Sequence, residues 1–290
     1  MSAPFVTPTG PVLLAAAGIV GLVVGSFLNV VIHRLPRMLE RRWREECAEL
    51  ADTPPEVPPE RYNLVVPRSA CPACGRPIRA WENIPVLSWL ALGGRCRGCR
   101  APIGLRYPAV ELLGGALAVL LAWRFGPTPA FAGGLLLAWM LLAAAAIDLT
   151  HLILPDALTL PLLWAGLLFN LRGTYASLGD AVIGAVAGYL VLWIVYHGFR
   201  LATGKEGLGR GDFKLLAALG AWLGWQMLPL VILAAALVGA LAGGAWLLLA
   251  RRGREHPIPF GPFLAAAGLL ALLAGPAIEH AWLAWQFAGR

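Results

Sequence analysis

The chain has 290 residues, of which 59% are hydrophobic and only 13% are charged. Soluble domains carry about 25% charged residues, and the mean hydropathy of +0.71 is far above what a water-soluble globule needs. This composition excludes a soluble domain and predicts an all-α polytopic membrane protein. The net charge of +7 would also fit a nucleic-acid-binding protein, but the placement of the basic residues argues against nucleic acid as a partner.

Eight apolar stretches approach the length of about 20 residues that a helix needs to cross a bilayer. We expect transmembrane helices at 11–32, 109–123, 130–147, 157–171, 181–199, 213–225, 227–250 and 262–287. The sequence therefore divides into a first transmembrane helix (1–33), a loop domain (34–107) and a core of about seven helices (108–290).

The basic residues fall almost entirely on one side of this eight-helix arrangement. Of 23 lysines and arginines, 20 lie within 34–106, 200–214 and 251–254. Because cytoplasmic loops are enriched in lysine and arginine, we expect the 34–107 loop in the cytoplasm and the N-terminus outside. No charged side chain precedes Arg34, so the first helix is expected to be retained rather than cleaved as a signal peptide.

The first apolar stretch contains features of helix packing. Gly21 and Gly25 have the G-x-x-x-G spacing that permits close approach of a second helix. Asn29 and His33, near the inner end, are expected to make interhelical hydrogen bonds. The segment 34–61 mixes Glu and Arg before becoming proline-rich, which predicts a helix followed by an extended linker.

Four of the five cysteines form two C-x-x-C pairs in the loop domain. Cys71 and Cys74 are separated from Cys96 and Cys99 by 21 residues, a spacing close to that of four-cysteine zinc sites. Four thiolates leave no open position on the metal, so the zinc would be structural. Two disulfides or a redox dithiol are the competing interpretations, disfavoured by the reducing cytoplasm and by the two matched pairs, respectively. Cys47 stands alone and is interpreted as an ordinary thiol.

The stretch 81–90, between the two cysteine pairs, is too apolar for a freely solvated loop. It either packs on the cysteine pairs or lies in the membrane interface, where tryptophan is enriched.

Three acidic residues near the apolar stretches have simple structural interpretations. Asp156 and Asp180 directly precede apolar runs and are interpreted as helix N-caps. Glu111 lies near the start of its stretch, where a carboxylate suits the helix dipole.

Two other aspartates are candidates for function. Asp148 ends an apolar run, where the helix dipole disfavours an anion. Asp212 follows glycines at 207, 209 and 211, which permit unusual backbone angles and close approach of another segment. An N-cap role remains an alternative for Asp212.

The eight-helix arrangement brings Asp148 and Asp212 to the same depth on the cytoplasmic side. Two close carboxyls cannot easily both be ionised, so one holds a proton while the other is free. Such a pair can activate a water molecule and protonate an amine leaving group, which is aspartic peptidase chemistry. A proton-coupled transporter that uses the pair as a relay, and a non-catalytic assembly scaffold, are the alternatives.

The sequence resembles the type IV prepilin leader peptidases of type IV pilus and type II secretion systems. The motifs behind this resemblance run in order through nearly the whole chain: GSFLNVV (25–31), HRLP (33–36), both cysteine pairs, ENIP (82–85), Asp148 with LPD (154–156), GRGD (209–212) and PIPFGP (257–262). Two positions vary from other members, since Arg210 fills a variable slot and Thr150 stands where some have another acid.

The resemblance implies an intramembrane aspartic endopeptidase of the bacterial inner membrane, with Asp148 and Asp212 as its catalytic pair and a periplasmic N-terminus. It implies prepilin and pseudopilin substrates, whose short basic leader is removed at the cytoplasmic face. It also implies N-methylation of the new N-terminus with S-adenosylmethionine. The chain has no G-x-G-x-x-G in a β-α context, so no residue is predicted to bind the methyl donor.

Overall fold

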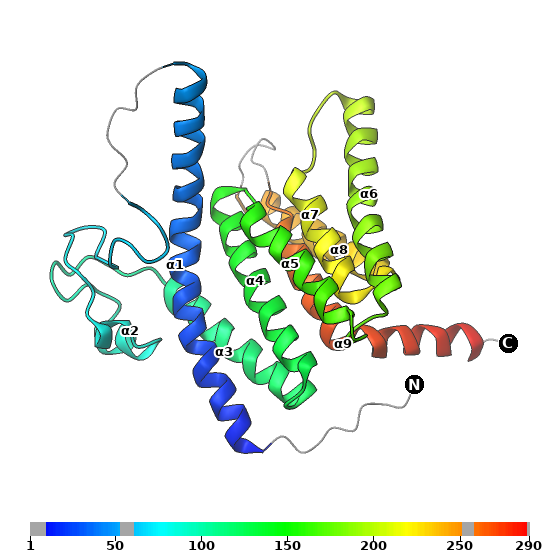
Figure 1. Cartoon of the computed structure of the whole chain (residues 1–290), viewed down its shortest axis with the longest axis horizontal. Helices are drawn as coiled ribbons and strands as arrows, with labels where there is room; N and C mark the ends of the chain where they lie inside the picture. Colours follow the sequence, from blue (N-terminus) through cyan, green and yellow to red (C-terminus); the bar gives the residue numbers. More distant parts are fainter. Residues whose placement is uncertain (1–9, 53–60, 251–257, 289–290) are drawn as a thin grey trace. The chain divides into compact units, whose positions relative to one another are not determined.

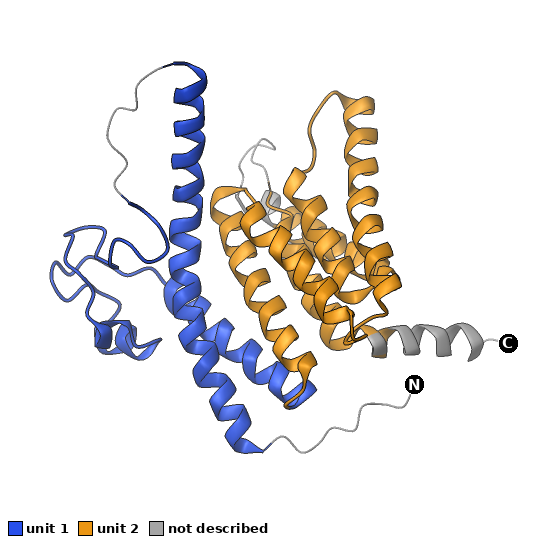
Figure 2. Ribbon diagram, in the orientation of Figure 1, with its two compact units in different colours: residues 1–126 blue, residues 127–290 orange. Residues whose placement is uncertain are grey.

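The computed structural model describes residues 10–52, 61–250 and 258–288, and its regular structure is almost entirely helical. The chain divides into two compact units, residues 1–126 and 127–290, coloured separately in Figure 2. This division differs from the three segments expected from the sequence, because the helix expected at 109–123 belongs to the first unit. Within the described residues, β-structure is limited to two isolated antiparallel bridges, one around each C-x-x-C pair in the segment that we call the cysteine loop (61–105).

The first unit is built on two packed helices with a loop between them. Its elements are α1 (Pro11–Leu50), the 3-10 turn η1 (Ala80–Asn83), α2 (Leu87–Ala91) and α3 (Arg106–Phe125). The backbones of α1 and α3 approach so closely that a Cβ at Gly21 would lie 2.6 Å from the carbonyl oxygen of Gly114. Asn29 donates its Nδ2 to the carbonyl of Tyr107 at 3.0 Å. The interhelical contact and the Asn29 hydrogen bond predicted from the sequence are therefore present.

α1 is much longer than a membrane crossing. Its 40 residues rise about 60 Å, against about 30 Å for the hydrocarbon core of a bilayer. The helix continues through Pro36 and past residue 33, where the sequence predicted the boundary between the first transmembrane helix and the loop domain. The charged second half of α1 therefore extends beyond the apolar half as one continuous helix.

The second unit surrounds a short, buried helix. Its elements are α4 (Pro129–His151), α5 (Asp156–Asn170), α6 (Leu178–Thr203), α7 (Arg210–Leu223), the 3-10 turn η2 (Trp225–Met227), α8 (Leu228–Ala250) and α9 (Gly261–Ala288). α7 contacts α5, α6 and α9, and all its side chains from 215 to 223 are buried. With 14 residues it is only about 21 Å long. Its contacts with three helices and its buried side chains place it at the centre of the unit.

Polar side chains fix the C-terminal end of α7. Asn170 donates its Nδ2 to the carbonyls of Ala221 and Trp222 at 2.8 and 2.9 Å, and the indole Nε1 of Trp222 donates to the carbonyl of Leu162 at 2.8 Å. The last carbonyls of a helix have no partner within the helix, so Asn170 satisfies groups that would otherwise be buried and unpaired.

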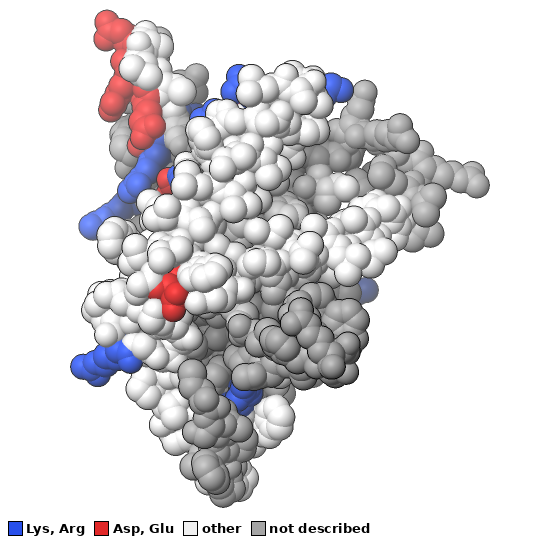
Figure 3. All heavy atoms as spheres, turned by 90° about the vertical axis from the view of Figure 1, so that its right-hand side faces the viewer, with Lys and Arg blue, Asp and Glu red and all other residues white. Residues whose placement is uncertain are grey.

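The apolar helices confirm the predicted fold class. Among the described residues, five helices are long and apolar enough to cross a membrane, and they cover Pro11–Leu50, Arg106–Phe125, Pro129–His151, Leu178–Thr203 and Trp225–Ala245. Shorter apolar helices cover Asp156–Asn170 and Gly261–Gly275. The face in Figure 3 is correspondingly poor in charged side chains. Each of the eight predicted stretches coincides with a helix, while the number of crossings stays a prediction.

The N-cap interpretations of Asp156 and Asp180 are wrong. Asp156 is the first residue of α5, and its carboxylate accepts hydrogen bonds from Lys214 Nζ at 2.6 and 2.8 Å. The N-cap of α6 is Ser177, whose hydroxyl donates to the Asp180 carboxylate at 2.6 Å and accepts from the Asp180 N–H at 3.1 Å. Both acids are therefore held by polar partners within the first turn of their helices.

Candidate active site and metal centre

Asp148 is held between the end of one helix and the start of another. It lies one turn before the end of α4, is 5% exposed, and accepts a hydrogen bond from the N–H of Gly261 at 2.9 Å. Gly261 is the first residue of α9, where backbone N–H groups have no partner within the helix. The positive end of α9 therefore stabilises a carboxylate that the negative end of α4 would disfavour.

Asp212 lies in the first turn of α7 and is also 5% exposed. The N-cap of α7 is Gly209, so the alternative interpretation of Asp212 as an N-cap is wrong. A Cβ at Gly209 would lie 3.1 Å from the Asp212 Oδ2, which shows how closely the glycine turn fits around the carboxyl. Among the described residues, Asp212 Oδ1 has no hydrogen-bond partner although it is buried. This oxygen therefore keeps a hydrogen-bonding capacity that the described residues do not use.

Leu154, in the link between α4 and α5, brings together the segments that carry the two carboxyls. A Cβ at Gly211 would lie 2.6 Å from Leu154 Cβ, and a Cβ at Gly261 would lie 3.1 Å from Leu154 Cδ2. The end of α4 and the starts of α7 and α9 lie toward the same end of the second unit in Figure 1. The glycines are therefore required because the segments around the pair approach at backbone distance.

A buried carboxyl pair of this kind can perform acid–base chemistry. Since two neighbouring carboxyls share a proton, one can accept a proton from water while the other gives one to a leaving group.

The ion pair of Lys214 with Asp156 holds the start of α7 to the start of α5, two residues from Asp212. No local sequence pattern indicates this ion pair, because its members are 58 residues apart.

The four cysteines of the two C-x-x-C pairs converge in the first unit. The sulfurs of Cys71, Cys74, Cys96 and Cys99 all lie within 4.8 Å of one another, and none of these residues forms a disulfide. Tetrahedral zinc with bonds of about 2.3 Å requires sulfurs about 3.8 Å apart, and Cys71 Sγ and Cys99 Sγ are separated by 3.8 Å. The donor set and its spacing therefore fit a metal ion, whose identity the cluster alone does not fix.

The backbone around the second cysteine pair favours the thiolate form of Cys96. N–H groups of Cys99 and Gly98 lower the pKa of the Cys96 thiol to about 6, against its usual value of about 8.5. The Gly98 N–H donates to the Cys96 sulfur at 3.4 Å. Because metal binding requires thiolates, this arrangement favours the form of Cys96 that a metal needs.

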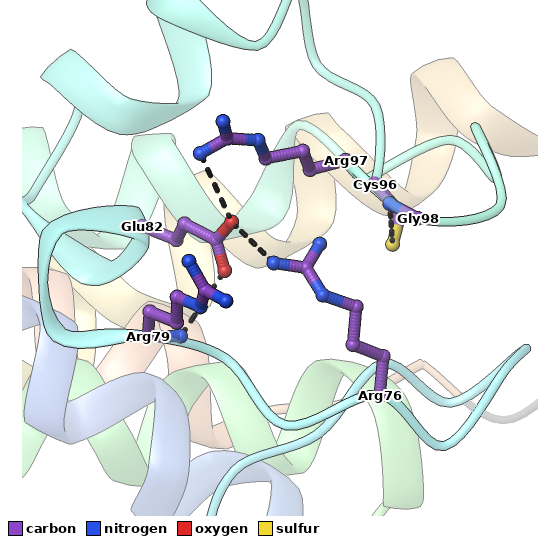
Figure 4. A network of polar contacts seen from close by, with 6 residues as sticks. All are labelled: Arg76, Arg79, Glu82, Cys96, Arg97 and Gly98. Atoms are coloured by element: carbon purple, nitrogen blue, oxygen red, sulfur yellow. Dashed lines mark hydrogen bonds and ion pairs between the residues drawn. The ribbon is translucent and has the colours of Figure 1, made fainter.

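Glu82 connects the two cysteine pairs (Figure 4). Its Oε1 lies 2.7 Å from Arg76 Nη2 and 3.8 Å from Arg97 Nη1, and its Oε2 accepts from the Arg79 N–H at 3.1 Å. Arg76 follows the first pair by two residues, and Arg97 lies inside the second. The hydrogen bond from the Arg79 N–H, followed by the one from Arg76, lowers the pKa of Glu82. This connecting role of Glu82 was not predicted from the sequence.

These features define a class: a multi-pass helical membrane protein that combines a buried carboxyl pair with a four-cysteine module. Comparison with known proteins is consistent with this class. Residues 19–125 match the bacterial peptidase A24 N-terminal domain, and residues 135–244 match the Type IV leader peptidase family. No solved structure matches the chain.

Several relatives match almost end to end, and each is named a prepilin leader peptidase/N-methyltransferase. The protein of Aeromonas salmonicida strain A449 is 60% identical over 264 residues, which cover 90% of this chain and 91% of the relative. The protein of Pseudomonas aeruginosa is 57% identical over 271 residues, covering 93% of each. The protein of Burkholderia pseudomallei strain 1026b is 58% identical over 273 residues, covering 92% and 87%. The chain belongs to the Type IV leader peptidase family.

Proposed function

We propose that this protein is an intramembrane aspartic endopeptidase that removes the basic leader from type IV prepilins and type II secretion pseudopilins, with Asp148 and Asp212 as its catalytic pair. Family membership supports prepilin processing and gives no support to the proton-coupled transporter. The observation that supports the assignment of the residues is the burial of both carboxyls on segments that meet at Leu154.

The environments of the two carboxyls give them different roles in the proposed reaction. The Gly261 N–H and the start of α9 stabilise Asp148 as an anion, so it accepts a proton from water. The water oxygen attacks the scissile carbonyl carbon, and a tetrahedral intermediate forms. Asp212, with one oxygen unpaired, gives its proton to the amide nitrogen as the C–N bond breaks. The products are a leader carboxylic acid and a pilin with a free amine.

The placement of the chain in the membrane agrees with such a substrate. The positive-inside distribution supports a cytoplasmic 34–107 loop and a periplasmic N-terminus in the bacterial inner membrane. A prepilin with a basic leader and an apolar helix would keep its leader on that same side. Its cleavage site would then lie at the membrane edge, at the level proposed for the carboxyl pair.

Methylation of the new N-terminus is the second proposed activity. It is supported by the names of the relatives, each of which includes N-methyltransferase. S-adenosylmethionine is the methyl donor that these names and the resemblance imply, and no residue is assigned to it. Zinc is the metal proposed for the four cysteines, where it would hold the two C-x-x-C turns together as a structural ion.

The experiment that tests the proposal is incubation of the purified chain with a prepilin, followed by mass spectrometry. Cleavage appears as loss of the leader mass and methylation as a gain of one methyl group. Asp148→Asn and Asp212→Asn should each abolish cleavage, while Asp180→Asn, which changes a half-buried acid of the same unit, should retain most activity. Substantial cleavage by either site variant would remove the proposed catalytic pair.

A further inference from the structure

Four large apolar side chains are exposed close together around η1 and α2, in the loop between α1 and α3. These side chains, which we call the apolar edge, are Trp81 (55% exposed), Ile84 (46%), Leu87 (65%) and Leu90 (61%). Trp89, within the same stretch, turns inward and donates its Nε1 to the carbonyl of Ile103 at 3.1 Å. The apolar edge is therefore a distinct outer side of a folded segment and not an unfolded loop.

A buried carboxylate fixes the position of the apolar edge along helix α3. Glu111, which is 9% exposed, accepts a hydrogen bond from the N–H of Val86 at 2.7 Å. Glu111 lies five residues into α3, which is about 8 Å along the helix axis. It also packs against the apolar half of α1, because a Cβ at Gly25 would lie 2.7 Å from Glu111 Cα. The turn before α2 is thus held beside the first turns of α3, as Figure 1 shows.

If α1 and α3 cross the membrane, this part of α3 lies near the point where both helices leave the bilayer. α1 and α3 are both long and apolar enough to cross a membrane, and the Val86–Glu111 hydrogen bond lies next to their packed apolar parts. Side chains held at this level and pointing outward meet the boundary between headgroups and acyl chains. Tryptophan and leucine suit that boundary better than they suit water.

The positive charge of the loop favours contact with an anionic membrane surface. Residues 61–107 contain eight arginines and a single acidic residue, Glu82, which is already engaged by Arg76. The guanidinium of Arg79 lies 5.2 Å from the centre of the Trp81 ring, so a cation stands directly beside the apolar edge. A basic segment at a membrane attracts anionic lipid headgroups, whereas it would repel a basic leader peptide.

We propose that the apolar edge inserts into the headgroup region of a bilayer containing anionic lipid, so that the cysteine loop is seated on the membrane surface. Trp81, Ile84, Leu87 and Leu90 supply the apolar contact, and the arginines around them bind the lipid phosphates. The loop then has three attachments: α1, α3 and the lipid surface itself. The proposal is independent of the peptidase reaction, since it concerns only the first unit.

A photo-crosslinking experiment on the full chain tests this placement. A benzoylphenylalanine residue replaces Leu87 or Leu90 and, as a matched control, Val65, which is 79% exposed in the same loop but lies outside the apolar edge. Each variant is reconstituted into phosphatidylcholine vesicles with or without phosphatidylglycerol. We expect lipid adducts at 87 and 90 to exceed those at 65 several-fold, and to increase with phosphatidylglycerol. Equal yields at all three positions, or yields indifferent to the anionic lipid, would overturn the proposal.

A gentler variant keeps the test decisive if the crosslinker disturbs the loop. Trp81→Phe preserves the apolar character of the edge and removes one indole. If Trp81 is inserted, the difference in tryptophan emission between the unchanged chain and the variant should be smaller in vesicles of lipids brominated near the headgroup than in unbrominated vesicles. Equal differences in the two kinds of vesicle would place Trp81 outside the lipid and refute the insertion.

Discussion

Replacing Gly261 by alanine tests the contact on which the geometry of Asp148 depends. The new Cβ would lie 2.7 Å from Asp148 Oδ2 and 3.1 Å from Leu154 Cδ2, where ordinary contacts begin at 3.4 Å. The carboxylate therefore has to move by roughly 0.7 Å or lose its hydrogen bond from the backbone. A misplacement of about 1 Å at a catalytic group costs on the order of 100-fold in rate. We expect kcat for leader cleavage to fall by about 10- to 100-fold.

The same substitution should leave the fold intact, which separates the active-site effect from a loss of stability. Alanine favours a helix interior over glycine by at most about 1 kcal/mol, which offsets part of the cost of displacing the carboxylate, so the melting temperature should change little. Gly198→Ala in α6 is the matched control, because a Cβ there has no neighbour within 4 Å. The assay is kcat and KM for a prepilin in the same detergent, with the melting temperature measured in parallel. Full activity of Gly261→Ala would show that the α9 contact does not position Asp148 for catalysis.

Three further substitutions test other parts of the structure. Glu82→Ala should accelerate transfer of bound zinc to a chelator several-fold, with a smaller effect of Glu82→Gln, because the carboxylate connects the two cysteine pairs; an unchanged transfer rate would contradict that role. Cys71→Ser should reduce bound zinc, measured by elemental analysis, because it removes one of the four thiolates; unchanged zinc would refute the four-cysteine centre. Asn170→Ala should destabilise the second unit by about 3 kcal/mol or more, because it leaves several buried backbone groups unpaired. A melting temperature equal to that of the unchanged chain would show that these hydrogen bonds contribute little.

Hydropathy was sufficient to find the helices, and it failed only at their ends. Backbone groups in hydrocarbon must bond within their own segment, so a long apolar stretch has little choice but to be helical. A helix after residue 33 was predicted, but its continuity with the first apolar helix was not, because the second half of α1 is charged and contains Pro36, a residue that usually interrupts helices. The positions of the eight stretches needed no knowledge of packing, whereas the grouping of α3 with α1 depends on tertiary contacts that hydropathy does not report.

The partners of the acidic residues could be predicted only where they lie close by in the sequence. The N-cap of α6 was readable in principle, because Ser177 and Asp180 have the spacing of a capping box with an acid at its third position. The partner of Asp156 could not be predicted from the sequence, because Lys214 belongs to a different helix far along the chain. In the same way, Glu111 was assigned to a helix dipole, while its main partner is the Val86 N–H in the preceding loop.

The surroundings of Asp148 reverse the argument that first singled it out. In the sequence it was unusual because it stands at the C-terminal end of its helix, where an anion is disfavoured. In the structure its carboxylate meets the first N–H of α9, and Asp212 lies in the first turn of α7. Each carboxyl is therefore at the N-terminal end of a helix, which offsets part of the cost of burying two acids together. Since Gly261 is the first residue of α9 and donates to Asp148, it belongs to the proposed active site as much as the glycine turn before α7 does.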